Sequence, residues 1–421
     1  MCIKLVITPI VAQGALWGIA YEVHFFYCFK GPCSLYWDTM PQPKKDFSAK
    51  ALRIHRKLKG KIGTAPKVSI RTRADLSVYY TPGVGAVSSL LGKHPEKARE
   101  YTMKGNSVAI ISDGSAVLGL GNIGPYGALP VMEGKAMIFK TFANIDAFPI
   151  VLDTQDTEKI ITTIEHIAPV FGGINLEDIA APRCFEIERR LSKSLNIPVM
   201  HDDQHGTAIV VLAALINAFT VVKKDMRHSR IVIVGAGAAG TATAKLLHLT
   251  GVRDLIVLDS KGIITSSRRN LTPEKRELAK ITNRRHIEGD VAAALLGADA
   301  VIGVSGPGTI SVRDVQGMNK KGIVFALANP IPEIMPDLAR KAGAAVVASG
   351  RSDFPNQVNN ALIFPGVFRG ALDHGVQKIT EDMKLRAGRA LAAVIKNPKP
   401  NLIVPSIFDT RVVPAISRAI F

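Results

Sequence analysis

A glycine-rich turn between two apolar runs constrains the fold of this chain more than any other stretch. The turn lies in the segment RIVIVGAGAAGTATAKLLHLTGVRDLIVLDS, which runs from Arg230 to Ser260. Its first run, Arg230–Val234, is rich in β-branched residues and typical of a buried parallel strand. A helical pattern follows to about Thr250, and a second apolar run ends at Asp259. This order predicts an α/β fold with a Rossmann-type, doubly wound parallel sheet.

The turn itself has the residues that a dinucleotide phosphate requires. Its six residues are Gly235, Ala236, Gly237, Ala238, Ala239 and Gly240. The first glycine permits a tight turn, the second leaves room for a pyrophosphate, and the third lets the helix pack closely on the strand. Asp259 lies 24 residues after Gly235, where an acid meets the adenosine ribose. We therefore predict that the turn and Asp259 bind a dinucleotide; the alternative is a glycine turn without a cofactor.

Two further strands of the same sheet are expected to end beside this cofactor. The run Ala298–Val304 ends at Ser305, and the run Gly322–Leu327 leads to Asn329. Parallel strands joined by crossover helices bring these ends to the carboxyl edge of the sheet, where such sheets bind ligands. Ser305 and Asn329 are therefore predicted to border the dinucleotide.

The length of the chain, 421 residues, favours two domains over a single core. Apolar residues make up 47% of the chain and charged residues 21%, as in an ordinary globular protein. The four cysteines are too few for a disulfide scaffold, and they are Cys2, Cys28, Cys33 and Cys184. A reducing compartment is therefore expected, which predicts a cytoplasmic protein.

The net charge of +18 raises the question of nucleic-acid binding. Residues 1–75 hold 13 Lys and Arg against 4 acidic residues, so half of the net charge lies there. The basic cluster Lys50–Lys59 has no interleaved aromatic residues that could stack on bases. A solvated face that attracts anionic substrates explains this charge more simply, so we predict no nucleic-acid partner.

The chain divides into four predicted segments. Residues 1–45 form an extension of unknown role, and residues 46–205 form a catalytic α/β domain. Residues 206–375 form the nucleotide domain, and residues 376–421 form a C-terminal helix and tail. The apolar stretch Thr207–Val222 is shorter than the roughly 20 residues that a membrane span needs, so we expect a buried helix and no membrane association.

Local patterns in the first domain predict several elements that can be compared with the structure. Strands are expected at Ser107–Ser112, Ala147–Asp153, Ile167–Phe171 and Pro198–His201. An extended segment that leads into a turn is expected over Ser77–Gly85, and a long helix from Asn175 to about Leu195.

An acidic group in the first domain suits a divalent cation. Glu177 and Asp178 are adjacent, and Asp202 and Asp203 follow a predicted strand. Taken alone, acids at the start of a helix complement the helix dipole. Three carboxylates, with waters and a chelating substrate, would complete the octahedral coordination of Mg²⁺ or Mn²⁺. The histidines His201 and His205 show no zinc-ligand spacing and are expected to be turn or packing residues.

Tyr80 and Lys135 are candidates for proton transfer. Tyr80 directly precedes a Thr-Pro-Gly turn, and Lys135 begins a largely apolar run. The ordinary interpretation makes one a packing residue and the other a surface cation. A lysine beside a divalent metal, or partly desolvated, would have a pKa well below about 10.4 and could act as a base.

Seven motifs, in order over residues 47–421, resemble the short, prokaryotic type of malic enzyme. They are YTPGVG, LGLGNIGPYGALPVMEGK, INLEDIAAPRCFEIE, HDDQHGT, GAGAAG, ANP and PNQVNNALIFPG. The resemblance implies that Tyr80 is the general acid and Lys135 the general base. It also implies that the metal ligands are Glu177, Asp178 and Asp203, that Asp202 lies just outside them, and that Asn329 and Asn360 hold the substrate carboxylate and the nicotinamide region. Larger family members grip malate with an arginine shortly before the LGLG segment, where this chain has Val117.

The activity implied by the resemblance is the oxidative decarboxylation of malate to pyruvate and CO₂, with Mg²⁺ or Mn²⁺ and with NAD or NADP. Asp259 favours NAD, but Lys261, Arg268 and Arg269 lie close in sequence and could accommodate a 2′-phosphate. Malolactic or oxaloacetate decarboxylase activity, or an inactive nucleotide or metabolite sensor, are the alternatives. The family also implies a homodimer or a higher assembly.

Overall fold

The computed structural model describes residues 4–10, 20–26, 47–117 and 119–421 of the chain. They belong to two compact units, Met1–Lys59 and Gly60–Phe421. The first unit contains strand β1 (Lys4–Ile10), which pairs antiparallel with β2 (Ala20–Phe26), and helix α1 (Ser48–Leu58). The other residues of the extension predicted for 1–45 lie outside the described residues.

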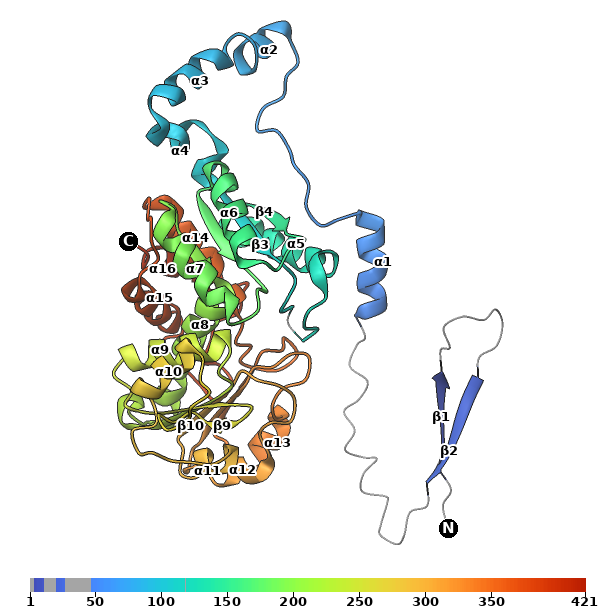
Figure 1. The fold of residues 1–421 in the computed structure, drawn as a ribbon, viewed down its shortest axis with the longest axis vertical. Coiled ribbons are helices and arrows are strands. Elements are labelled where there is room, and N and C mark those ends of the chain that lie inside the picture. The colour runs from blue at the N-terminus through green and yellow to red at the C-terminus, as the bar shows by residue number, and fades with distance from the viewer. Residues whose placement is uncertain (1–3, 11–19, 27–46, 118) are drawn as a thin grey trace. The chain divides into compact units, whose positions relative to one another are not determined.

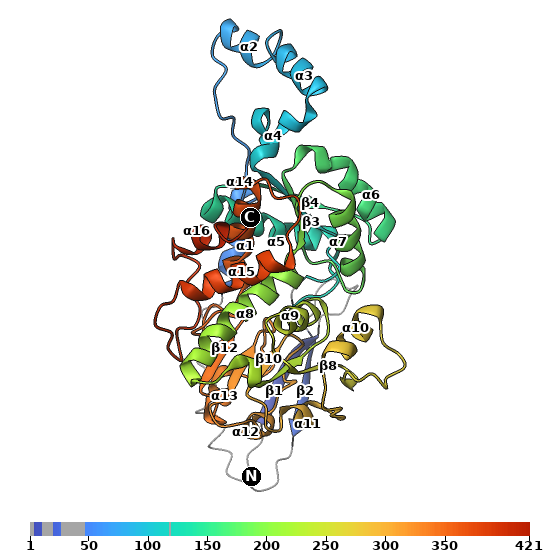
Figure 2. The ribbon, with the colours of Figure 1, turned by 90° about the vertical axis from the view of Figure 1, so that its left-hand side faces the viewer.

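The second unit begins with short helices that bury none of their side chains. They are α2 (Arg73–Tyr79), α3 (Val84–Lys93), η2 (Pro95–Lys97), α4 (Ala98–Tyr101) and η3 (Met103–Asn106). Both views show α2 and α3 away from the two sheets of this unit (Figures 1 and 2). The extended segment predicted for Ser77–Gly85 is wrong, because the Thr72–Asp75 capping box starts a helix that runs through Ser77.

A four-stranded parallel sheet, in the order β4-β3-β5-β6, follows these helices. Its strands are β3 (Ser107–Ser112), β4 (Asp146–Val151), β5 (Gly173–Leu176) and β6 (Val199–His201). The accompanying helices are α5 (Gly124–Ala143), α6 (Thr157–Ile167), η4 (Ala168–Val170) and α7 (Arg183–Ser194). Strands β3, β5 and β6 are buried along their whole length, as expected for parallel strands covered on both faces.

Two predictions for this sheet are wrong. The strand expected at Ile167–Phe171 is the end of α6 and a 3₁₀ turn, and the helix expected from Asn175 starts only at Arg183. A short apolar run does not distinguish a strand from a buried helix end. The strand starts only at Gly173. This glycine packs against Phe368, where an added Cβ would lie 3.0 Å from the ring.

The second sheet has six strands in the order β12-β11-β10-β7-β8-β9, and all are parallel except β9. Its strands are β7 (Arg230–Val234), β8 (Asp254–Asp259), β9 (Gly262–Ile263), β10 (Ala300–Gly303), β11 (Ile323–Ala326) and β12 (Val346–Ser349). Its helices are α9 (Ala238–Leu249), α10 (Pro273–Ile281), α11 (Val291–Leu295), α12 (Val312–Gln316) and α13 (Pro336–Lys341). The predicted α/β class with a Rossmann-type sheet is confirmed.

Helix α8 (Asp202–Val222) joins the two sheets through a shared core. By length and composition it could span a membrane, but 72% of its most apolar window is buried inside the protein, which identifies it as a core helix. The remaining elements are η5 (Met226–His228), η6 (Asn360–Leu362), α14 (Phe364–Asp373), α15 (Glu381–Ala393) and α16 (Val412–Ser417). The rings of Phe364 and Phe368 lie 4.7 and 5.6 Å from that of Phe139 on α5, so α14 packs on the first sheet's helix.

Candidate active site

Three carboxylates converge at the carboxyl ends of two neighbouring strands. Glu177 and Asp178 directly follow β5, and Asp203 lies in the first turn of α8, directly after β6. One oxygen of each carboxylate lies within 4.8 Å of the others. Glu177 and Asp178 are buried, and Asp203 is partly exposed. The first two acids therefore do not begin a helix, as the sequence suggested, but the structure brings all three predicted ligands together.

The backbone at Asp178 makes this convergence possible. Its φ of 53° is left-handed, a conformation that aspartate tolerates better than most residues. In this conformation the Asp178 N–H donates to Asp203 Oδ2 over 2.8 Å, so one ligand orients another.

Lys135 enters the same cluster from α5. Its side chain is only 7% exposed, its Nζ lies 2.7 Å from Glu177 Oε1, and it donates to Asp202 Oδ2. Burial favours the neutral amine, but Asp202, Glu177 and Asp203 outweigh it and raise the pKa of Lys135 above its usual value. Burial alone therefore does not lower the pKa of Lys135, because the ammonium is surrounded by carboxylates.

The carboxylates respond to the same burial. Burial raises the pKa of Glu177 well above its usual range, although Lys135 opposes the shift. Burial likewise raises the pKa of Asp202 to about 6, again against the attraction of Lys135. Crowded acids with one ammonium between them form an electrostatically unsatisfied pocket, which is the expected state of a cation-binding site.

The predicted asparagines approach this site from the second half of the chain. An added Cβ at Gly206 would lie 1.8 Å from Asp202 Oδ1 and 3.1 Å from Asn360 Cβ, which places Asn360 beside Asp202. Asn329 lies against the glycine-rich loop before α5, where an added Cβ at Gly119 would come within 2.5 Å of its carbonyl oxygen. The structure thus brings Asn360 to the acidic end of α8 and Asn329 to the loop.

Tyr80 is not brought to Lys135 within one copy of the chain. It caps the end of α2 and is 65% exposed. Both views show α2 far from α5, which carries Lys135 (Figures 1 and 2). In the described part of the chain, Tyr80 therefore does not reach the carboxylate cluster of its own copy.

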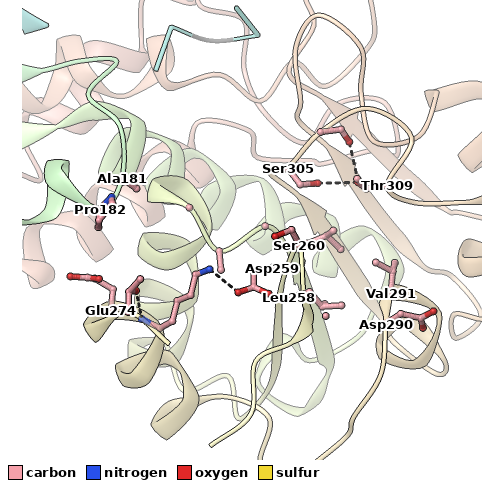
Figure 3. Close-up of a pocket in the computed structure, with 18 of the residues that line it drawn as sticks. Ala181, Pro182, Leu258, Asp259, Ser260, Glu274, Asp290, Val291, Ser305 and Thr309 are labelled. Atoms are coloured by element: carbon pink, nitrogen blue, oxygen red, sulfur yellow. Dashed lines mark hydrogen bonds and ion pairs between the residues drawn. The ribbon is translucent and has the colours of Figure 1, made fainter. Parts of the chain in front are cut away.

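A cavity of about 710 Å³ follows the carboxyl edge of the second sheet. Its lining includes Gly235, Ala236, Gly237, Asp259 and Ser305 from the nucleotide half, and Ala181, Pro182 and Phe185 from the segment after Asp178. Figure 3 shows Ala181 and Pro182 on one side of this cavity, across from Ser305 and Thr309. Its volume is in the range of small-molecule and cofactor sites.

The glycines of the turn have the geometry that a dinucleotide requires. Gly235 has a φ of 120°, an added Cβ at Gly237 would meet nothing within 4 Å, and an added Cβ at Gly240 would strike the Gly235 carbonyl at 1.8 Å. Gly237 lines the cavity and precedes α9 as its N-cap without a capping side chain, so no side chain satisfies the first N–H groups of this helix. Ala238 and Ala239 form the first turn of α9.

Asp259 is surrounded by hydrogen-bond donors. Arg268 Nη1 and Nη2 donate to its two oxygens over 3.0 Å each, Lys275 Nζ donates over 2.7 Å, and the Lys261 N–H donates over 2.9 Å. Burial would raise the pKa of Asp259, but these partners lower it to about 2. Figure 3 shows its carboxylate at the cavity with this ion pair to a lysine drawn as a dashed line.

Comparison with known proteins identifies the family of this chain. Residues 59–192 match the malic enzyme N-terminal domain, and residues 204–420 match the malic enzyme NAD-binding domain. The chain belongs to the malic enzyme family. The predicted resemblance is thereby confirmed.

Individual members of the malic enzyme family are similar over most of their length. The chain is 53% identical to the NAD-dependent malic enzyme of Geobacillus stearothermophilus, over 86% of this chain and 76% of that protein. It is 52% identical to the bifunctional malic/malolactic enzyme of Bacillus subtilis (strain 168), over 88% and 91%. The crystal structure of NAD-dependent malic enzyme from Thermotoga maritima superposes with a TM-score of 0.86 at 50% identity, covering 88% of this chain and 98% of that one.

Two residues of this malic enzyme family member escaped the sequence interpretation. Lys275 reaches Asp259 from the first turn of α10, 16 residues further along the chain. Glu188 lies on α7 and contacts the turn that carries Asp202 and Asp203. Only the fold brings these charges to the site, although Glu188 does belong to the motif INLEDIAAPRCFEIE.

Proposed function

We propose that this chain catalyses the oxidative decarboxylation of malate to pyruvate and CO₂ with reduction of NAD or NADP. The observation that carries the proposal is the buried Lys135 ammonium, 2.7 Å from Glu177, inside the three-carboxylate cluster. In this proposal residues 46–205 hold malate and the metal, residues 206–375 the nucleotide, and residues 376–421 close the fold. The reducing compartment that suits the free, buried Cys184 supports a cytoplasmic location.

Glu177, Asp178 and Asp203 would hold a Mg²⁺ or Mn²⁺ ion. The donor set fits such an ion, because hard divalent cations prefer carboxylate oxygens and these three lie within 4.8 Å of one another. When bound, the cation supplies positive charge that stabilises negative charge developing on the C2 oxygen of malate. Asp202, which bonds Lys135, would orient the base rather than ligate.

Lys135 would accept the proton of the malate hydroxyl, and a bound nicotinamide supplies the acceptor for the C2 hydride. In the carboxylate pocket the pKa of Lys135 is raised, which favours the protonated form. Positive charge among the same carboxylates would reverse this effect and lower that pKa, so base function and cation binding are coupled. Asn360 is placed to orient the substrate beside Asp202, and Tyr80 would protonate C3 after decarboxylation.

Tyr80 would reach the site of a second copy of the chain. Several large apolar side chains are exposed on the α2–α3 segment and just before it, namely Val68, Ile70, Leu76, Val78, Tyr79 and Val84. Exposed large apolar side chains gathered on one segment are typical of an interface. A homodimer that covers this surface would carry Tyr80 to the partner's Lys135, which explains why neither copy unites the two residues alone.

Mixing two inactive variants tests this arrangement. Tyr80→Phe and Lys135→Ala should each be nearly inactive. If Tyr80 acts across the dimer, one site of each mixed dimer has both groups intact. Denaturing and refolding an equal mixture should therefore restore about a quarter of the wild-type rate, because half of the dimers are mixed. A mixture as inactive as its components would place Tyr80 in the same copy as Lys135.

The adenosine end of the cavity would accept either NAD or NADP. A carboxylate has about four lone-pair positions, and four donors already occupy those of Asp259. Asp259 therefore has little capacity left for a ribose hydroxyl, while Arg268 and Lys275 keep further N–H groups for a 2′-phosphate. The NAD preference that Asp259 suggests in the sequence is weakened by this arrangement.

Lys275→Ala should lower kcat/KM with NADP by about 10-fold to 100-fold, the value of a charge-assisted hydrogen bond, and change kcat/KM with NAD much less. Initial rates with each cofactor measure the effect. Lys280→Ala, on an exposed part of the same helix, is the matched control. An equal loss with both cofactors would mean that Lys275 only supports the fold of α10.

The decisive assay is malate-dependent formation of NADH or NADPH in the presence of Mn²⁺, with identification of the products. Pyruvate and CO₂ would support the proposal. Lactate would indicate malolactic activity. This alternative is supported by the similarity to the bifunctional malic/malolactic enzyme of Bacillus subtilis. Binding of Mn²⁺ and dinucleotide without any turnover of malate would instead indicate a sensor.

A further inference from the structure

Among the described residues, Glu188 forms its hydrogen bonds with the turn that carries Asp202 and Asp203. Its Oε1 accepts from the His201 N–H over 2.7 Å. Its Oε2 accepts from Gln204 Nε2 and lies 3.0 Å from both that atom and His205 Nε2. A carboxylate can only accept, so the His205 Nε2 must donate. One side chain on α7 thus binds both ends of the turn.

The hydrogen bonds to Glu188 matter for this turn, because α8 starts directly after β6 without a connecting loop. His201 is the residue that precedes α8, and its side chain makes no capping hydrogen bond. Of the two acids in the turn, Asp203 accepts a backbone hydrogen bond from the Asp178 N–H. Glu188, on α7, accepts the His201 N–H, the N-cap backbone donor that the N3 side chain binds in a capping box.

The anchor is partly buried and charged. The Glu188 side chain is 13% exposed, and the Lys384 ammonium of α15 lies 3.3 Å from His205 Nε2. Burial would raise the pKa of Glu188, but His205, Lys384 and His201 lower it to about 2, so the carboxylate stays ionised. Hydrogen bonds to a buried carboxylate are among the stronger ones in proteins, and such a bond fixes its donor well.

We propose that Glu188 is a positioning residue for the metal site, and that α7 ties the two ligand-bearing segments together. Helix α7 begins five residues after Asp178, and its Glu188 holds the turn of Asp203. Glu188 therefore adds a tie between the two segments beyond the pairing of β5 with β6 and the Asp178–Asp203 hydrogen bond. This inference rests on the metal site of the proposed function, and it adds a residue that does not itself touch the ion.

Glu188→Gln tests the proposal with little change in shape. The amide keeps one acceptor oxygen but carries no charge and turns an N–H₂ group toward one side, so Gln204 and His205 lose the carboxylate that accepts from them. We expect Mn²⁺ to bind about 10-fold to 100-fold more weakly, as when outer partners of metal ligands are lost. Electron paramagnetic resonance of free Mn²⁺, in titrations of the full chain without malate or dinucleotide, measures this affinity. Glu186→Gln, an exposed acid on the same helix, should bind Mn²⁺ like the wild type.

A second variant and a second ligand separate positioning from general damage. His205→Ala removes one donor to Glu188 and should also weaken Mn²⁺ binding, by less than Glu188→Gln. NADH binding, followed by its fluorescence, should stay close to wild type in both variants, whereas misfolding would weaken it too. Wild-type Mn²⁺ affinity in folded Glu188→Gln, or equal losses of Mn²⁺ and NADH, would overturn the inference. A wild-type protein that binds Mn²⁺ but does not oxidise malate would refute the proposed function alone.

Discussion

Lys135→Ala is expected to abolish malate turnover while leaving dinucleotide binding close to that of the wild type. The ammonium lies between Glu177 and Asp202, and it does not line the cavity of the glycine turn. Loss of a general base lowers kcat by about 100-fold to 10,000-fold. Steady-state rates with saturating malate and Mn²⁺, and NADH fluorescence titrations, measure the two effects.

Lys140→Ala is the matched control for this prediction, because Lys140 lies on the same helix and is mostly exposed. Removing Lys135 also leaves two buried carboxylates without a counter-ion, which destabilises a protein on its own. Thermal unfolding of each variant should therefore accompany the rates. A stable Lys135→Ala protein with a rate near that of the wild type would exclude Lys135 as the base.

Asp203→Asn should have the second largest effect, a loss of Mn²⁺ affinity of more than about 100-fold. The number of ligand charges is one of the features that tune the affinity of carboxylate sites over several orders of magnitude. An asparagine oxygen can still accept the Asp178 N–H that Asp203 accepts over 2.8 Å, so the substitution removes charge with little change in geometry. Titration with Mn²⁺ in the absence of substrate measures the loss.

The same titration on Asp382→Asn, an exposed acid on α15, controls for the general loss of negative charge. The Asp203 variant should also need far more Mn²⁺ for half-maximal activity, while its dinucleotide affinity stays close to wild type. Unchanged Mn²⁺ binding would remove Asp203 from the ligand set and leave the cluster of carboxylates without a metal function.

Much of the nucleotide half follows from local sequence. The run Arg230–Val234, the three glycines and the acid at Asp259 each have a local physical requirement, and the strand, turn and helix lie where the sequence predicts them. The acidic group follows from the sequence only in part, because the predicted strand Pro198–His201 places Asp202 and Asp203 at a sheet edge, whereas Glu177 and Asp178 are expected at the start of a helix. The boundaries of the four predicted segments remain a proposal.

Tertiary structure decided the rest, because charge neighbours and interfaces depend on segments far apart in the chain. The sequence alone identified the Rossmann turn and the residues of the carboxylate cluster, since each depends on a short stretch. Only the fold placed Arg268 and Lys275 on Asp259, Glu188 on the turn of Asp203, and Lys135 among acids that raise its pKa. Only the fold shows that Tyr80 lies away from Lys135. The position of the Tyr80 hydroxyl depends on tertiary packing, which no local sequence pattern determines.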